Sequence, residues 1–204
     1  MPVPWSKPLA SAFYARPADL VAPALLGCLL VRRWRGVELV SRIVETEAYL
    51  PGADAASHAN RGRTPRNAPM FGVAGRAYVY FIYGMYDMFN VVCDAAGVPA
   101  AVLVRACEPV QGIDRMMRWR GVRRVHDIAN GPGKLCRAMR ITRSLNRHDL
   151  RQAPLWIAPG ELPAHEVVER SGRIGVAYAG ADARLPLRFF IRDHRHVSRG
   201  QPLG

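Results

Sequence analysis

The alternation of hydrophobic and polar positions predicts many short strands with a few helices between them. Near the start of the chain, residues 19–26 fit an amphipathic helix, and residues 28–33 and 37–49 fit two strands. The dipeptide Arg35-Gly36 predicts a tight turn, so these two strands should form a hairpin. Further strands are expected at residues 78–83, 90–94, 101–106, 155–158, 173–179 and 187–192, and helices at residues 111–120 and 133–140.

No internal repeat or linker divides the chain, so residues 1–204 are expected to form one domain. Within it, residues 1–17 would be a proline-rich lead-in and residues 193–204 a tail. Residues 51–76 are rich in Gly, Pro, Asn and Arg and show weak periodicity. Irregular segments of that length inside a compact domain usually carry function, so this loop is a candidate for the site.

The charge balance is strongly basic, with 29 Lys+Arg against 16 Asp+Glu and a formal net charge of +13. Only Lys7 and Lys134 are lysines, and a guanidinium group can bind phosphate with two hydrogen bonds. Genome base composition would explain the preference for Arg over Lys, but it does not explain the positive surplus. We therefore expect a nucleic-acid partner. The arginines between Arg115 and Arg124 fit a solvated helix face and a phosphate-binding surface equally well.

The remaining composition excludes several classes of protein. Four cysteines lie far apart and form no CxxC pair, which argues against a zinc ribbon, a redox dithiol or a disulfide framework. They are expected to be buried thiols. The most apolar stretch, residues 20–31, is too short to span a membrane, and no signal-peptide pattern opens the sequence. A soluble intracellular protein is expected.

Two acidic residues stand at the end of the second predicted strand. The strand period of two places Glu45, Glu47 and Tyr49 on one face, ahead of the long loop. A carboxylate in a partly desolvated cleft can act as a general base for water. An exposed strand face with a salt bridge to an arginine explains the same pattern.

A tyrosine-rich run forms the next unusual segment. Residues 78–86 contain four tyrosines, and Gly84 directly after Tyr83 would place that ring at an exposed tip. Such a ring in a basic protein could wedge into a base stack, and Tyr80 could be one wall of a stacking pocket. A tyrosine-rich, half-buried strand is the simpler alternative.

Several single residues are also candidates for a role. Arg105 follows an apolar run, so it needs a buried partner, for which Glu47 is the natural carboxylate. The segment Gly131-Pro132-Gly133-Lys134 could receive a phosphate at a helix start, although it lacks the spacing of a Walker loop. His58 lies in the long loop. The other histidines show no metal-ligand spacing, and the pair His194 and His196 is expected at the surface.

Taken together, these segments resemble a known family. The series comprises Glu45-Thr46-Glu47-Ala48-Tyr49, His58, Thr64-Pro65-Arg66-Asn67, Tyr78-Val79-Tyr80, Tyr83-Gly84-Met85-Tyr86, Asn90, Leu103-Val104-Arg105-Ala106 and Gly131-Pro132-Gly133-Lys134-Leu135-Cys136. Its order and spacing resemble the alkyladenine (3-methyladenine) DNA glycosylase family over residues 25–192. The match is weaker at residues 59–76 and after Pro159, so lesion range and DNA contacts carry over less directly.

This resemblance implies an α+β fold, with a curved antiparallel β-sheet and flanking helices, related to the C-terminal domain of a formyltransferase. It implies a monomeric, monofunctional DNA glycosylase of base excision repair that needs no cofactor and no metal. Such an enzyme flips an alkylated or deaminated purine out of double-stranded DNA and hydrolyses its N-glycosidic bond, leaving an abasic site. In a bacterium it would act in the cytoplasm, and in a eukaryote in the nucleus.

The resemblance also assigns roles to residues of this chain. It implies that Glu47 activates the water that attacks C1′ and that Arg105 helps to position this water. Tyr83 would fill the gap left in the duplex, and Asn90 would exclude the exocyclic amino group of guanine. The base-binding pocket would contain Tyr49, His58, Tyr80, Asn90 and Leu103. Arg66 and Lys134 are the candidate phosphate contacts.

Two other functions are compatible with the same residues. A non-catalytic DNA- or RNA-binding module would use the basic, tyrosine-rich surface without requiring Glu47. A nucleotide-handling transferase would need a cofactor loop, which the sequence does not show. A glycosylase that also cleaves the strand would need an amine for a Schiff base, and neither lysine lies near the acid-aromatic segments.

Overall fold

The computed structural model describes residues 5–200 and contains nine strands, four α-helices and four 3₁₀ helices. The strands are β1 (Leu29–Trp34), β2 (Val37–Tyr49), β3 (Ala77–Ile82), β4 (Tyr86–Val92), β5 (Ala101–Gln111), β6 (Arg151–Gln152), β7 (Leu155–Ala158), β8 (Val168–Ser171) and β9 (Arg188–Ile191). The α-helices are α1 (Ser11–Tyr14), α2 (Ala18–Ala24), α3 (Ile113–Arg120) and α4 (Pro132–Ala138). The 3₁₀ helices are η1 (Ala68–Phe71), η2 (Val125–Asp127), η3 (Arg143–Leu145) and η4 (Ala177–Arg184).

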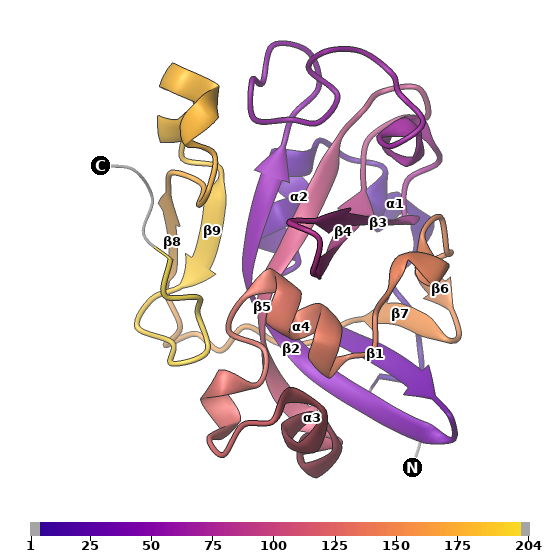
Figure 1. Cartoon of the computed structure of the whole chain (residues 1–204), viewed down its shortest axis with the longest axis vertical. Coiled ribbons are helices and arrows are strands. Elements are labelled where there is room, and N and C mark those ends of the chain that lie inside the picture. Colours follow the sequence, from indigo (N-terminus) through magenta and orange to yellow (C-terminus); the bar gives the residue numbers. More distant parts are fainter. Residues whose placement is uncertain (1–4, 201–204) are drawn as a thin grey trace.

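All strand pairs are antiparallel, and one path through the sheet runs β3-β4-β5-β2-β1-β7-β6 (Figure 1). The long strand β2 is the branch point of the sheet. Its first half pairs with β1, whereas residues 45–47 pair with β9, which in turn pairs with β8. The register between β2 and β5 shifts on both sides of Glu45. Irregularities of this kind bend a strand and redirect its side chains, so they explain how β2 can pair first with β1 and then with β9.

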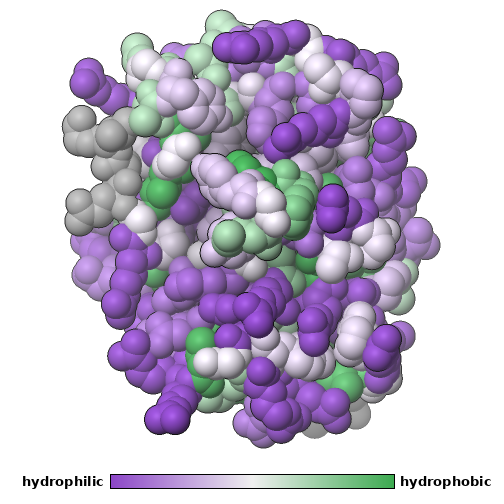
Figure 2. All heavy atoms as spheres, in the orientation of Figure 1, coloured by the Kyte–Doolittle hydropathy of each residue, from purple (hydrophilic) through white to green (hydrophobic). Residues whose placement is uncertain are grey.

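Helices cover both faces of this curved sheet. Helix α2 packs on β2 and β5, and α4 packs on β4 and β5 from the opposite side, with α3 next to it (Figure 1). The core between them contains fully buried Ile43, Phe89 and Leu135. Figure 2 shows the α4 face, which is mainly hydrophilic, with a small hydrophobic group near its middle, where Figure 1 draws the β3–β4 hairpin.

The architecture confirms the expected α+β domain around a curved antiparallel sheet. The predicted strands 37–49 and 155–158 match β2 and β7, and Arg35 and Gly36 form the hairpin turn with positive φ. The four cysteines are buried free thiols, as expected. Within residues 5–200, none of the helices has the length and apolar character that crossing a membrane would require.

One predicted strand was wrong, and several short elements were missed. Residues 173–179 do not form a strand, because the backbone turns at Gly175 (φ 75°) and enters η4. The strand β8 was missed, because its sequence Val-Glu-Arg-Ser lacks hydrophobic alternation and its pairing with β9 determines it. Residues 5–17 of the lead-in pack against the rest of the domain. Tyr14 is fully buried, and the Leu9 N–H donates to the Ile157 carbonyl.

The junction between α2 and β1 depends on a close approach of two backbones. A methyl group at Gly160 would overlap the carbonyl oxygen of Gly27, and Gly27 itself has φ 84°. We predict that Gly160→Ala lowers the free energy of unfolding by about 1–3 kcal/mol, a typical cost of overpacking. Urea unfolding measures this change. Glu161→Ala, at the exposed neighbouring position, is the matched control, and equal midpoints for the two variants would contradict this packing.

Candidate functional site

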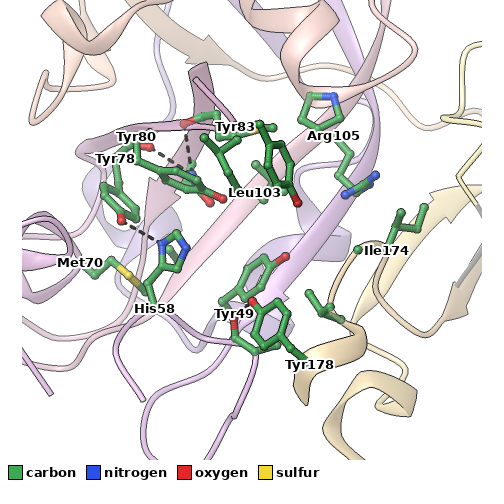
Figure 3. Close-up of a pocket in the computed structure, with 18 residues that line it drawn as sticks. Tyr49, His58, Met70, Tyr78, Tyr80, Tyr83, Leu103, Arg105, Ile174 and Tyr178 are labelled. Carbon is green, nitrogen blue, oxygen red and sulfur yellow. Dashed lines mark hydrogen bonds between the residues drawn. The ribbon is translucent and has the colours of Figure 1, made fainter. Parts of the chain in front are cut away.

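A cavity of about 210 Å³ opens between the end of β2, the β3–β4 hairpin and two irregular segments. Of the sequence-predicted residues, it brings together Tyr49, His58, Tyr80, Tyr83, Asn90, Leu103 and Arg105 (Figure 3). The space exceeds what a single water needs, so the cavity can take a larger ligand. Its walls are mostly aromatic and aliphatic, which suits a flat organic ring.

One wall of the cavity is a cluster of aromatic rings. The ring centroids of His58 and Tyr80 lie 4.5 Å apart at 72°, and those of Tyr78 and Tyr80 lie 5.2 Å apart. His58 Nδ1 and the Tyr78 hydroxyl share a hydrogen bond of 3.0 Å (Figure 3). Burial raises the pKa of Tyr78 to about 12 and also raises the pKa of Tyr80 and Tyr49. The three phenols are therefore neutral at physiological pH.

The long loop carries His58 in a fixed position because Asn67 ties the loop together. The Asn67 side-chain amide donates to the His58 and Gly62 carbonyls, each at 2.8 Å, and its oxygen accepts from the Thr64 N–H at 2.7 Å. Arg66 lies exposed outside this turn, with its guanidinium 5.5 Å from the centroid of the Tyr80 ring. The loop is thus an ordered part of the cavity.

On the other side of the cavity, buried side chains from β4 and β5 lie next to each other. Asn90 pairs in register with Tyr78 on one side and with Leu103 on the other. Its side-chain amide donates to the Tyr78 carbonyl at 3.2 Å, which fixes its orientation. Both Asn90 and Leu103 are 3% exposed, so neither can move aside without disturbing the sheet.

Three buried charges lie behind the cavity, at the branch point of β2. The Arg105 Nε donates to a Glu45 oxygen at 2.9 Å, and its Nη1 donates to Glu47 Oε2 at 3.1 Å. This confirms the expected pairing of Arg105 with Glu47. Both carboxylates are fully buried, and together they raise the pKa of Arg105 against the opposing effect of burial.

Glu47 receives two further hydrogen bonds from residues that line the cavity. The Tyr49 hydroxyl donates to Oε2 at 2.9 Å, and the Ile174 N–H donates to Oε1 at 2.7 Å. Arg105, Tyr49 and Ile174 all line the cavity, whereas Glu47 itself is fully buried behind them. The Glu47 carboxylate is therefore held behind the cavity by donors that themselves line it. Figure 3 shows these three donor residues, Tyr49, Arg105 and Ile174, around the cavity.

Glu45 is anchored by the end of the chain and by β9. It accepts from Arg188 Nε at 2.7 Å and from the N–H and hydroxyl of Ser198 at 2.7 and 2.8 Å. The residues expected to be a tail therefore contribute to this cluster. The surface prediction for His196 was wrong, since it is 1% exposed, and burial lowers its pKa to about 4. No local pattern indicated that this segment returns to β2.

The far wall of the cavity was missed because the segment was interpreted as a strand. Arg173 is fully buried and forms two hydrogen bonds of 2.7 Å with Asp54, while its guanidinium lies 4.9 Å from the Tyr49 ring centroid. This pair joins the long loop to the segment that carries Ile174 and Tyr178. The cavity is also lined by residues that were not singled out from the sequence, among them Ala56, Met70, Met88, Ile174, Val176 and Tyr178.

The β3–β4 hairpin ends at the mouth of the cavity. Tyr83 and Gly84 both have positive φ (53° and 67°), and Tyr83 is 74% exposed, as the sequence predicted. Behind the tip, the Tyr86 ring packs so closely on Gly133 that a Cβ there would approach it to 2.6 Å. Packing against Tyr86 therefore accounts for the glycine at position 133, and no bound phosphate is needed to explain it. Lys134 is exposed and donates to Asn130 Oδ1 at 2.8 Å.

The methylpurine-DNA glycosylase family pattern matches residues 12–195 of this chain. The chain belongs to this family. It is similar to a protein of Myxococcus xanthus named "Putative 3-methyladenine DNA glycosylase", with 50% identity over 196 residues that cover 96% of each chain. It is also 43% identical over 203 residues to the human DNA-3-methyladenine glycosylase, covering 93% of this chain and 67% of the human one.

As a member of the methylpurine-DNA glycosylase family, the protein is a DNA N-glycosylase of the repair of alkylated purines. This confirms the resemblance inferred from the order of the motifs. It also agrees with the architecture, because an aromatic cavity backed by a buried carboxylate suits an enzyme that encloses a base and hydrolyses its bond to a sugar.

His58 provides a measurable test of how the glycosylase pocket is built. Burial, and next to it the charge of Arg66, lowers the pKa of His58 below 6.5. Because the neutral form is favoured in the folded state, His58 reduces stability only as the pH falls below the unfolded value near 6.5. We predict an NMR titration midpoint for His58 below 6.5, and a higher midpoint in Arg66→Gln. A midpoint at or above 6.5 in the wild type would contradict this environment.

Proposed function

We propose that this glycosylase acts as a monomer that flips a damaged purine out of duplex DNA and hydrolyses its N-glycosidic bond with Glu47 as general base. One observation carries the proposal: the Glu47 carboxylate is held by Arg105, Tyr49 and Ile174 directly behind an aromatic cavity. A water between this carboxylate and a bound nucleotide would face C1′ of the sugar. Removal of its proton by Glu47 would make it a stronger nucleophile.

The cavity walls support a purine as the ligand. Tyr49, His58 and Tyr80 present ring faces and edges to the cavity. Electron-rich rings attract a cationic ligand, and 3-methyl- or 7-methylpurine nucleotides carry a positive charge on the base. The relatives named after 3-methyladenine support that base as one substrate. Deaminated purines such as hypoxanthine would bind in the same cavity by stacking.

Selection against normal guanine would rest on Asn90, because its side chain is buried and fixed to the Tyr78 carbonyl. A 2-amino group on the base would meet a side chain that cannot retreat. Leu103, which pairs with Asn90 in register, closes the same part of the cavity. Weakened pairing of a damaged base would lower the cost of flipping, which adds selectivity before the base enters.

The proposed reaction is a simple hydrolysis. Water oxygen bonds to C1′, the C1′–N bond breaks, and its electron pair leaves with the base. The water proton passes to Glu47. A methylated cationic base leaves as a neutral molecule, whereas hypoxanthine needs a proton from another donor. Among the described residues that line the cavity there is no lysine, which supports hydrolysis rather than a Schiff-base route that cleaves the strand.

Tyr83 and the surface arginines would bind the duplex. The Tyr83 ring at the hairpin tip is placed to enter the gap left by the flipped nucleotide. Arg66, beside the cavity mouth, and Lys134, on α4 behind the hairpin, are proposed to contact phosphates. Because the protein has a formal net charge of +13, its affinity for DNA should decrease steeply as the salt concentration rises.

We predict that Glu47→Gln abolishes base release while DNA binding is retained. Glutamine keeps the size of the side chain, but it cannot take a proton, so single-turnover release should decrease at least 100-fold. The measurement uses duplexes with one hypoxanthine or ethenoadenine, and methylated DNA, with the product read before and after alkali. Strand breaks should appear only after alkali.

Glu169→Gln is the matched control, because Glu169 lies on β8 and forms a solvent-exposed ion pair with Arg192. It should release bases at the wild-type rate. Equal activity of Glu47→Gln and wild type would contradict the role of Glu47. Tight DNA binding by the wild type without release from any of these substrates would favour the non-catalytic binding module.

A further inference from the structure

Tyr178 occupies a conspicuous position that the proposed function does not use. It lies in η4, lines the cavity and is 70% exposed. Within residues 5–200, Tyr83 and Tyr178 are the two Phe, Tyr or Trp residues with more than half of their surface exposed. Figure 3 shows them on opposite sides of the same cavity. Tyrosine is enriched at binding interfaces, because its ring is apolar and its hydroxyl can form a hydrogen bond, so an exposed ring at the rim of a cavity is a candidate for a ligand contact.

The segment that carries Tyr178 is firmly held. The Tyr178 hydroxyl donates to the Ala56 carbonyl at 3.2 Å, and the Ala55 N–H donates to Asp182 at 2.9 Å, so η4 is tied to the long loop at two points. Val176 and Ala179, which flank Tyr178 in the sequence, belong with Ala56 to a small buried cluster. The Tyr178 ring is therefore presented in a fixed orientation, although most of its surface is accessible to solvent.

The position of Tyr178 relative to Glu47 indicates which part of a nucleotide it would meet. Tyr178 follows Ile174 by four residues, and the Ile174 N–H donates to the Glu47 carboxylate. Tyr49, which also donates to Glu47, lines the same cavity as Tyr178 (Figure 3). Under the proposed function, C1′ would lie on this side of the cavity, next to Glu47, and the base would contact the rings of Tyr49, His58 and Tyr80.

We propose that Tyr178 packs against the deoxyribose of the flipped nucleotide and retains it in the cavity. This inference rests on the proposed function, since it requires a nucleotide to enter. Tyr83 would fill the vacated space in the duplex, and Tyr178 would hold the extruded sugar on the other side of the mouth. Because the contact is with sugar, Tyr178 should act on every lesion and should not distinguish between bases.

Stopped-flow fluorescence of a duplex with one ethenoadenine tests this, because unstacking of that base changes its emission before it is released. We expect Tyr178→Ala to lower the equilibrium constant for flipping about tenfold, a typical effect of removing one aromatic contact with a nucleotide. Tyr178→Phe keeps the ring and loses only the hydroxyl contact with Ala56, so it should flip like the wild type. Leu20→Ala, which truncates a 56% exposed side chain on α2, is the control for a surface truncation.

An undamaged duplex of the same sequence distinguishes a sugar contact from a general DNA contact. Tyr178→Ala should bind this duplex with the wild-type affinity, because no nucleotide is extruded from it. On the lesion duplex, Tyr83→Ala should also weaken flipping, because the gap in the base stack is then not filled. Equal loss of affinity for both duplexes would overturn the inference in favour of a phosphate contact. Wild-type flipping by Tyr178→Ala would overturn it outright, and so would a defect in Tyr178→Phe equal to that in Tyr178→Ala.

Thermal unfolding shows whether the effect is local. Tyr178→Ala should melt close to the wild type because the ring is largely exposed, and Tyr178→Leu, which keeps apolar contacts but removes the flat ring, should repeat the flipping defect. Wild-type flipping by Tyr178→Leu would overturn the ring contact. Failure of the wild type to release any base would refute the proposed function instead, so the two failures are distinguishable.

Discussion

Arg105 lies between two buried carboxylates, and the site depends on this interaction. An uncompensated charge at such depth costs several kcal/mol, so each member of the cluster requires the others. Arg105 therefore fixes Glu47 at the cavity and Glu45 against Arg188 and Ser198. The branch of β2 makes the arrangement available, because the register shifts beside Glu45 let one strand direct two acids at the same guanidinium.

Further hydrogen bonds and an ion pair hold the cavity walls around this cluster. Glu47 accepts hydrogen bonds from a side chain and a backbone N–H that both line the cavity, so the cavity walls and the proposed base are positioned together. The Asp54–Arg173 pair fixes the far wall to the long loop, and Asn67 fixes the loop around His58. The aromatic rings are thereby held in place before any nucleotide enters, which reduces the ordering cost of binding.

Most of the site residues on strands could be predicted from the sequence, whereas few of those on irregular segments could. Glu47, Tyr49 and Arg105 were accessible because a charge in an apolar strand needs a partner, and strand periodicity assigns faces. Ile174 and Tyr178 were not, because positive φ at Gly175 and a buried arginine turned an expected strand into the far wall. Likewise, His196 and Ser198 lie beside β2 through long-range packing that leaves no local pattern.

Arg105→Lys tests most directly whether a forked cation between the two carboxylates makes Glu47 effective. Lysine keeps the charge but offers a single ammonium group, which cannot contact Glu45 and Glu47 in the geometry of the guanidinium. Provided that circular dichroism shows a folded protein, we expect single-turnover base release to decrease at least tenfold, while binding to a lesion duplex stays within a few-fold of wild type. A release rate equal to wild type would contradict it.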